Sequence, residues 1–239
     1  MKKGVLYLIP NTLGQESIEG FLPLEIINKI LSIRVFAIEE IKSARRLLKK
    51  ADKDFPIDDC IFFQLDKHNK QENIEDIICQ LMKGNDVGVL SEAGTPCVAD
   101  PGAVLVEKAH ENEIKVKPLI GPSSIILSLM ASGLNGQNFT FHGYLPKEQY
   151  KRIAKLKEIE KITQLDNSSH LFIETPFRNQ HLFDDIIKNL QNDTQLCLAV
   201  NLTCNNERIT RKSVQEWKKT TLVLTKNPCI FIVGKSLLK

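Results

Sequence analysis

Residues 86–102 read Asp-Val-Gly-Val-Leu-Ser-Glu-Ala-Gly-Thr-Pro-Cys-Val-Ala-Asp-Pro-Gly, and this stretch decides the fold that we predict. Residues 87–90 are a short apolar run typical of a buried strand, a loop of small residues follows, and a helical pattern begins near Val104. Asp100 before Pro101 predicts a helix N-cap with proline at the first helical position. The loop is therefore expected at the carboxyl end of a strand, where ligands bind in open α/β sheets. A tight turn that holds no ligand is the competing interpretation.

Composition narrows the class of protein. Of the 239 residues, 42% are hydrophobic and 26% are charged, which predicts a globular protein with an apolar core. The net charge of +3 neither requires nor excludes a nucleic-acid partner. The apolar run 5–9 is too short for a signal peptide, and no stretch reaches the roughly 20 apolar residues of a membrane span. The six cysteines lack zinc-site spacing, so we expect reduced, mostly buried thiols, no metal and a cytoplasmic protein.

Strand and helix patterns alternate through the first half of the chain. Strands are expected at residues 5–9, 34–38, 60–65, 87–90 and 116–120, with amphipathic helices between them. This alternation predicts a mostly parallel sheet with helices on both faces. The pattern breaks at Gly121-Pro122-Ser123-Ser124, so we place the boundary between two α/β domains here, as residues 1–118 and 119–239.

The second half predicts another α/β domain with a mixed sheet. Its strands are expected at residues 139–143, 171–174, 196–200 and 230–233, and its two longer helices at 147–162 and 176–190. Ser213 followed three residues later by Glu216 matches a capping box that opens a last short helix. The chain lacks G-x-x-x-x-G-K-[ST], G-x-G-x-x-G, G-x-S-x-G and H-E-x-x-H, so common nucleotide-binding and hydrolase sites are excluded.

Several blocks, in order along the chain, resemble the signature loops of the tetrapyrrole methylase superfamily. The nearest branch is the one that 2′-O-methylates a cytidine ribose in small-subunit ribosomal RNA. The resemblance covers nearly the whole chain, and the ordered set is far more specific than any single block. The blocks are Leu6-Tyr7-Leu8-Ile9-Pro10, Ser91-Glu92-Ala93-Gly94-Thr95-Pro96, Ala99-Asp100-Pro101-Gly102, Gly121-Pro122-Ser123-Ser124, Phe141-His142-Gly143-Tyr144-Leu145-Pro146 and Glu174-Thr175-Pro176-Phe177-Arg178.

The resemblance implies a homodimer of two-domain subunits with S-adenosylmethionine in a cleft between the domains. It also implies an acceptor in ribosomal RNA or the small ribosomal subunit. By analogy with the family, the cofactor contacts would be Pro10, Ala93, Gly94, Val98, Ala99, Ser123, Ser124, Asn201, Leu202, Pro228 and Ile230.

Glu39, expected at a strand end, is the candidate general base for a ribose hydroxyl, with Arg178 or Lys42 as partners for a phosphate. Each candidate has a structural alternative. In the competing interpretation, Glu39 and its neighbour open the next helix, the basic residues 42–50 form a solvated face, and Ser123 and Ser124 cap a helix. A structural role is also the favoured interpretation of His142.

Two departures from the family pattern leave the acceptor open. Glu-Asp-Thr-Arg is replaced by Glu39-Glu40-Ile41-Lys42, and Ala-Arg-Glu-Leu-Thr-Lys by Ala199-Val200-Asn201-Leu202-Thr203-Cys204, which removes an Arg-Glu pair. Two rival functions therefore remain beside ribose methylation. One is a C-methyltransferase that acts on a tetrapyrrole-type small molecule, and the other is a non-catalytic binding protein that kept the fold.

Overall fold

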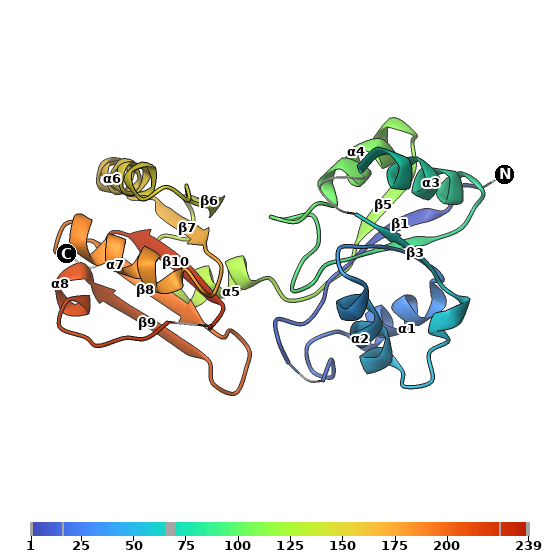
Figure 1. The fold of residues 1–239 in the computed structure, drawn as a ribbon, viewed down its shortest axis with the longest axis horizontal. Coiled ribbons are helices and arrows are strands. Elements are labelled where there is room, and N and C mark those ends of the chain that lie inside the picture. Colours follow the sequence, from blue (N-terminus) through green and yellow to red (C-terminus); the bar gives the residue numbers. More distant parts are fainter. Residues whose placement is uncertain (1, 16, 66–69, 225, 238–239) are drawn as a thin grey trace. The chain divides into compact units, whose positions relative to one another are not determined.

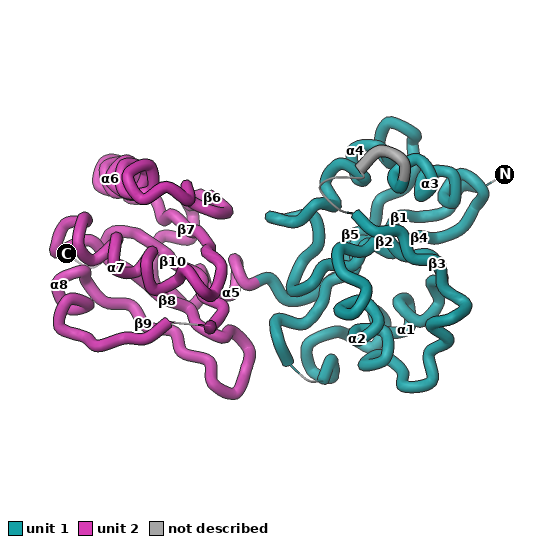
Figure 2. The backbone as a smooth tube through the Cα atoms, viewed as in Figure 1, with its two compact units in different colours: residues 1–123 teal, residues 124–239 magenta. Residues whose placement is uncertain are grey.

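The computed structural model of the protein describes residues 2–15, 17–65, 70–224 and 226–237. The chain forms two compact units, residues 1–123 and 124–239 (Figure 1 and Figure 2). Each unit is a sheet with helices packed on it, which confirms the predicted α/β class. The boundary between the units follows Ser123, whereas the sequence placed the domain boundary after residue 118.

The sheet of unit 1 is parallel throughout its described strands. Its spatial order is β3-β2-β4-β1-β5, and β1 lies between β4 and β5. All residues of β2 and β4 are buried, as expected for strands covered on both faces. The strands are β1 (Val5–Ile9), β2 (Val35–Ile38), β3 (Ile61–Gln64), β4 (Val87–Leu90) and β5 (Lys115–Pro118).

Two helices cover each face of this sheet (Figure 1). Helices α1 (Leu24–Ser32) and α2 (Ile41–Ala51) pack on one face, and α3 (Lys70–Met82) and α4 (Ala103–Glu111) pack on the other. A single 3-10 turn, η1 (Ile57–Asp59), precedes β3. Since the loop after β1 leads to one face and the loop after β4 to the other, the two diverge at the carboxyl edge of adjacent strands. Ligands of open α/β sheets bind at such a point.

Unit 2 contains the predicted mixed sheet, in the order β6-β7-β10-β8-β9. Strands β6 and β7 are parallel, and the other neighbouring pairs are antiparallel. The strands are β6 (Phe139–Tyr144), β7 (Ser169–Ile173), β8 (Gln195–Val200), β9 (Arg208–Ser213) and β10 (Cys229–Gly234).

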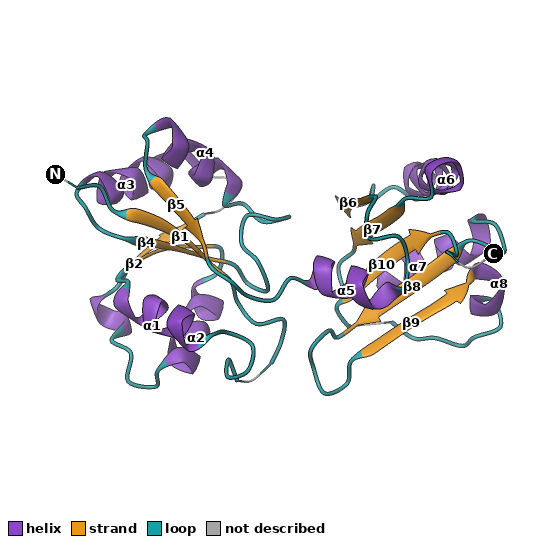
Figure 3. Ribbon diagram, turned by 180° about the vertical axis from the view of Figure 1, so that it is seen from behind, coloured by secondary structure: helices purple, strands orange, loops and turns teal. Residues whose placement is uncertain are grey.

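Helix α5 (Ser124–Ser132) lies on one face of this sheet, and α6 (Gln149–Asp166), α7 (Asn179–Asn189) and α8 (Val214–Trp217) lie on the other (Figure 3). Successive side chains of strand β8 point to opposite faces of the sheet, and both faces are buried. Leu196, Leu198 and Val200 join the core beneath α6, α7 and α8, while Cys197 and Ala199 lie between them in the strand and are also buried. The expected capping box is confirmed, because the Ser213 side chain accepts from the N–H of Glu216 and the Glu216 side chain accepts from that of Ser213.

The sequence missed one strand, and its expectation for the thiols was wrong. Strand β9 was not predicted, because Arg-Ile-Thr-Arg-Lys-Ser has one aliphatic residue and sits at a half-exposed sheet edge. The thiols are not mostly buried: Cys197 and Cys229 are buried, three others are half-buried and Cys79 is exposed. Within the described residues, no helix combines the length and apolarity needed to cross a bilayer.

Candidate functional site

The loops after β1 and β4 are bound together by main-chain and amide groups. The N–H of Asn11 donates to the carbonyl of Gly94 at 2.8 Å, and Asn11 Nδ2 donates to the carbonyls of Ser91 and Glu92 at 3.1 and 2.9 Å. Ser91 Oγ donates to the same Gly94 carbonyl at 2.8 Å. Asn11 and Ser91 are both buried, so these bonds satisfy groups that water cannot reach. The predicted ligand loop is therefore held in one conformation.

Gly94 occupies a position that only glycine takes without strain. Its φ is 69°, and a Cβ there would lie 3.0 Å from Leu13 Cδ2 and 3.4 Å from the carbonyl oxygen of Pro122. The loop after β5 approaches as closely, since a Cβ on Gly121 would lie 2.2 Å from Pro10 Cγ. Three loops thus meet at the carboxyl edge of the sheet. They bring together the predicted contacts Pro10, Ala93 and Gly94.

The segment between this loop and α4 corrects the predicted helix start. Helix α4 begins at Ala103 with Gly102 in the N-cap position, and no side chain caps it. Asp100 Oδ1 instead accepts a long 3.4 Å bond from the Gly102 N–H. Before Asp100, Cys97 and Ala99 have left-handed φ values of 66° and 58°, so that part of the segment cannot be helical. The predicted contacts Val98 and Ala99 lie in this segment and are exposed.

Burial controls the ionisation of this segment. It raises the pKa of the Cys97 thiol to about 11 and also raises the pKa of the Asp100 carboxyl above its ordinary value. A thiol with such a pKa is protonated at neutral pH and is a poor nucleophile. Cys97 is therefore not a candidate for covalent catalysis.

The two acidic residues after β2 have different surroundings. The Glu40 carboxylate accepts from the N–H groups of Lys42 and Ser43 at 2.8 and 2.7 Å and caps α2. These bonds, the one from Lys42 foremost, lower the pKa of Glu40. The structural interpretation of the acidic pair thus holds for Glu40. Glu39 directly follows β2 and is half-buried, and its carbonyl accepts from Gln64 Nε2 at 3.2 Å. Its role as a base stays a prediction.

Ser123 and Ser124 stand at the start of α5. The helix begins at Ser124, which puts Ser123 in the preceding position, and both residues are half-buried. Helix capping and ligand contact both remain open for these hydroxyls.

In unit 2, Arg178 is engaged with a buried carboxylate. Its Nη2 lies 2.5 Å from Glu174 Oε1, and its Nε donates to Thr175 Oγ1 at 3.2 Å. The Glu174 side chain is only 2% exposed, and the same oxygen accepts from the Thr175 N–H at 2.6 Å. Arg178 therefore neutralises a buried charge at the carboxyl end of β7. Its contact to a substrate phosphate stays a prediction.

Beside this pair, asparagines join the segments after β8 and before β10. Asn201, with φ of 51°, donates its N–H to the Pro228 carbonyl and its Nδ2 to Asn227 Oδ1, both at 3.0 Å. The buried Asn179 donates to the Asn227 carbonyl at 2.7 Å, and its own Oδ1 has no hydrogen-bond partner in the described structure. Leu202 and Ile230 are buried and Pro228 is exposed. Asn201, which replaces the lost acidic residue, is thus a connector within the unit.

His142 belongs to a chain of hydrogen bonds in unit 2. Its Nε2 lies 2.8 Å from Nδ1 of His170, whose Nε2 lies 2.8 Å from Ser168 Oγ, and that hydroxyl donates to Asp166 at 2.5 Å. Since the Ser168 proton is given to Asp166, His170 donates from Nε2 and His142 donates to His170. Both histidines are neutral in this arrangement. This supports the structural interpretation of His142.

We expect these hydrogen-bonded histidines to make unit 2 less stable in acid. Burial lowers the pKa of His142 to about 4, from an ordinary 6.5, and lowers that of His170. The unfolded chain therefore binds protons before the folded one does, and stability falls as the pH drops from about 7 towards 4. Thermal unfolding followed by Trp217 fluorescence at pH 7, 6 and 5 measures this. His142→Asn should reduce the dependence of the unfolding temperature on pH. His181→Asn replaces an exposed histidine that is not part of these hydrogen bonds, and it should leave that dependence unchanged.

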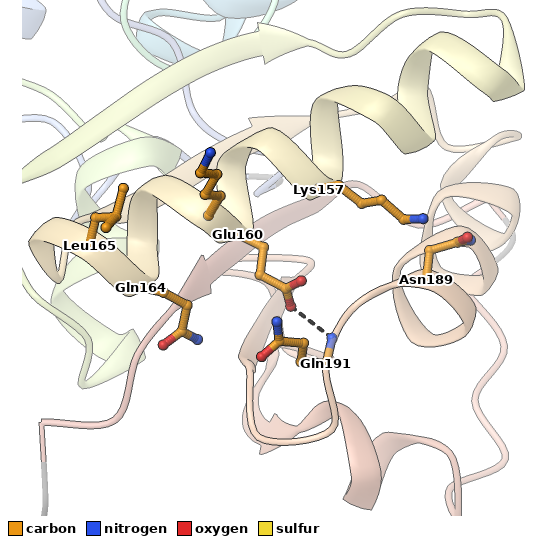
Figure 4. Close-up of a pocket in the computed structure, with 7 residues that line it drawn as sticks. Lys157, Glu160, Gln164, Leu165, Asn189 and Gln191 are labelled. Carbon is orange, nitrogen blue, oxygen red and sulfur yellow. Dashed lines mark hydrogen bonds between the residues drawn. The ribbon is translucent and has the colours of Figure 1, made fainter.

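A pocket of about 480 Å³ lies between α6 and the segment at the end of α7 (Figure 4). Its Glu160 points toward Gln191, whose N–H donates to the carboxylate at 2.8 Å, and the Thr194 hydroxyl donates to the same oxygen. None of the predicted site residues lines this pocket. The carboxylate holds the loop that precedes β8 against α6, which is a structural role.

Sequence reasoning missed three residues that shape these sites: Asn11, Asn179 and Asn227. An amide directly after a buried strand, as at Asn11, is a usable signal, because such a group must find partners among the neighbouring loops. No comparable signal marks Asn227, since its partners come from segments far away in the sequence.

Comparisons with known proteins agree with the geometry. The model of the family described as Tetrapyrrole (Corrin/Porphyrin) Methylases matches residues 22–218. A protein of Vibrio cholerae named Ribosomal RNA small subunit methyltransferase I is 30% identical over 205 residues, 86% of this chain and 67% of its own length. A protein of the same name from Escherichia coli O157:H7 is 30% identical over 234 residues, 97% of this chain and 78% of its own length. In fold, the chain resembles the crystal structure of the methyltransferase CobJ, with a TM-score of 0.65, 14% identity, and coverage of 98% of this chain and 95% of that one. The chain therefore belongs to the tetrapyrrole (corrin/porphyrin) methylase family and is a methyltransferase.

Proposed function

We propose that the protein transfers the methyl group of S-adenosylmethionine to a ribose 2′-hydroxyl of small-subunit ribosomal RNA. The observation that carries the proposal is the rigid loop pair at the carboxyl edge of β1 and β4, with Gly94 in a left-handed conformation at its centre. The names of the relatives from Vibrio cholerae and Escherichia coli support the choice of acceptor.

The residues of unit 1 fit such a cofactor chemically. Ala93, Val98 and Ala99 are exposed and uncharged, so a ligand can reach these three residues. Gly94, which has no Cβ, lets Leu13 and the Pro122 carbonyl pack directly against the loop and fixes its shape. We propose that Pro10, Ala93, Gly94, Val98, Ala99 and Ser123 contact it. For unit 2, Ser124, Asn201, Leu202, Pro228 and Ile230 stay predicted contacts, with Leu202 and Ile230 limited to their main chain because their side chains are buried.

The cofactor supplies an activated methyl group on a sulfonium, so the protein has to align the acceptor with it. Such alignment is worth about 7–11 kcal/mol of the barrier, whereas a general base adds roughly 10²–10⁴-fold. Positioning therefore dominates. We propose Glu39 as the base for the ribose hydroxyl and Arg178 as a contact to substrate phosphate, with its ion pair to Glu174 fixing the guanidinium. We also propose that the protein is a homodimer and that it acts on ribosomal subunits in the cytoplasm.

The decisive experiment is transfer of labelled methyl from S-adenosylmethionine to purified small subunits that lack their own ribose methylation. Label on one ribose 2′-oxygen is the expected result. Label on the RNA bases would contradict ribose methylation. Cofactor binding without label on any RNA would favour a small-molecule acceptor, and absence of cofactor binding in calorimetry would favour the non-catalytic alternative.

A further inference from the structure

A small pocket opens between the loops of unit 1 and helix α2. Its volume is about 160 Å³, and it is lined by the loop after β1, the loop after β4 and one side of α2. The helix contributes Ser43, Arg46 and Lys50, and the loops contribute Asn11 and Glu92 among others. The pocket therefore adjoins the loops that we propose for the cofactor.

The helix residues of the pocket form one stripe. Ser43, Arg46 and Lys50 are spaced by three and four positions, which places them on one side of a helix. The opposite side, with Leu47 and Leu48, is buried in the core, so the two cationic side chains are directed away from it. Arg46 is exposed and takes part in none of the ion pairs among the described residues.

The remaining contacts fix the walls of the pocket. Lys50 Nζ donates to the carbonyl of Gln15, which holds the ammonium at the pocket. The carbonyl of Glu92 accepts from Asn11 Nδ2 at 2.9 Å and from Ser43 Oγ at 3.5 Å, so the β4 loop is attached to α2 through its main chain. The Glu92 residue is exposed. Among the described residues that line the pocket, Arg46 and Lys50 are cationic and Glu92 is anionic.

We propose that this pocket binds a backbone phosphate of the RNA through Arg46 and Lys50. The inference rests on the proposed function and specifies where the substrate is held. Ligand pockets for whole small molecules measure roughly 300–1,000 Å³, so a phosphate group fits here and a complete nucleotide does not. Phosphate contacts set the register of a nucleic acid on a protein. Because Ala93 also lines the pocket, a phosphate held here lies beside the proposed methyl donor and positions the neighbouring ribose.

Arg46→Gln tests the pocket, and Arg45→Gln is its matched control. Arg45 is exposed on the same helix, does not line the pocket, and its replacement changes the charge equally. For Arg46→Gln we expect the Kd for an RNA fragment of the small subunit to rise about tenfold, with the salt dependence shallower by about 0.7–0.9, the contribution of one phosphate. The Kd for S-adenosylmethionine should stay within about twofold. Lys50→Gln should act in the same direction.

Other outcomes would overturn the inference. Equal losses in Arg46→Gln and Arg45→Gln would mean a diffuse basic surface. Weaker S-adenosylmethionine binding with unchanged RNA binding would assign the pocket to the carboxylate of the cofactor. If the wild-type protein binds RNA but transfers no methyl group to it, the proposed function fails while the comparison of the two variants still decides the pocket. If it binds no RNA, both fail.

Discussion

A Gly94→Val variant is expected to lose at least about 100-fold in affinity for S-adenosylmethionine, or about 2.7 kcal/mol. A β-branched residue at a φ of 69° is strained, and its Cβ alone would lie 3.0 Å from Leu13. The Gly94 carbonyl also accepts the Asn11 N–H from the loop after β1 and the Ser91 hydroxyl from its own loop, so the strain is passed to both residues. Isothermal calorimetry measures the loss, and methyl transfer should fall with it.

The matched control is Gly20→Val. Gly20 has a similar φ of 79°, but a Cβ there would meet nothing within 4 Å. The control therefore carries the backbone penalty without the steric one, and its cofactor affinity should stay near that of the wild type. Wild-type affinity in a folded Gly94→Val protein would show that the cofactor does not use this loop.

Asp185→Ala is expected to destabilise unit 2 by about 3–5 kcal/mol. Arg152 and Asp185 are 7% and 3% exposed, and Arg152 Nε and Nη2 donate to one Asp185 oxygen at 2.8 and 2.6 Å. Removing the carboxylate leaves a buried guanidinium without an anion. Domains are stable by only about 5–15 kcal/mol, so the loss is a large fraction. Urea unfolding followed by the single tryptophan, Trp217, reports unit 2 alone.

Two further variants serve as the control and the rescue for Asp185→Ala. Asp184→Ala removes the neighbouring, half-buried carboxylate, which accepts a hydrogen bond from Gln180 Nε2 at 3.1 Å, and should cost under about 1 kcal/mol. The double variant Arg152→Met/Asp185→Leu should recover most of the loss, because apolar residues often replace a buried ion pair at no cost. A loss below 1 kcal/mol in Asp185→Ala would mean that water reaches the guanidinium.

The sequence predicted those parts of the fold that depend on local patterns. Strands such as Val5–Ile9 and Val87–Leu90 were found to the residue, because an apolar run between turn residues has few alternatives. Strand β9 was missed since an edge strand needs no apolar face. The start of α4 was missed because Asp100 before Pro101 fits an N-cap pattern, whereas the helix begins at Ala103 without a side-chain cap. The left-handed φ values of Cys97 and Ala99 were not predictable either, because neither residue type announces them.

The candidate site also contains some features that the sequence predicts and others that it does not. Gly94 was predictable, because a glycine in a loop after a buried strand allows close approach of the backbone. The distinction between Glu39 and Glu40 was not, because it depends on which carboxylate the first turn of α2 captures. Likewise, the sequence alone does not distinguish the basic residues of α2. Once the buried side of the helix is known, Arg46 and Lys50 are seen to line a pocket and Arg45 is not.

The position of β1 between β4 and β5 in a parallel sheet has a consequence for biosynthesis. Leu6 pairs with Val87 and Val5 with Lys115, so β1 leaves the ribosome well before β4 and β5, the strands with which it pairs. Such non-local pairing slows folding. A nascent chain that ends before β4 exposes Val5–Ile9 as an unpaired apolar strand, a segment that chaperones bind and that aggregates when they do not. Stalled chains should therefore become protease-resistant in unit 1 only after β5 has been released.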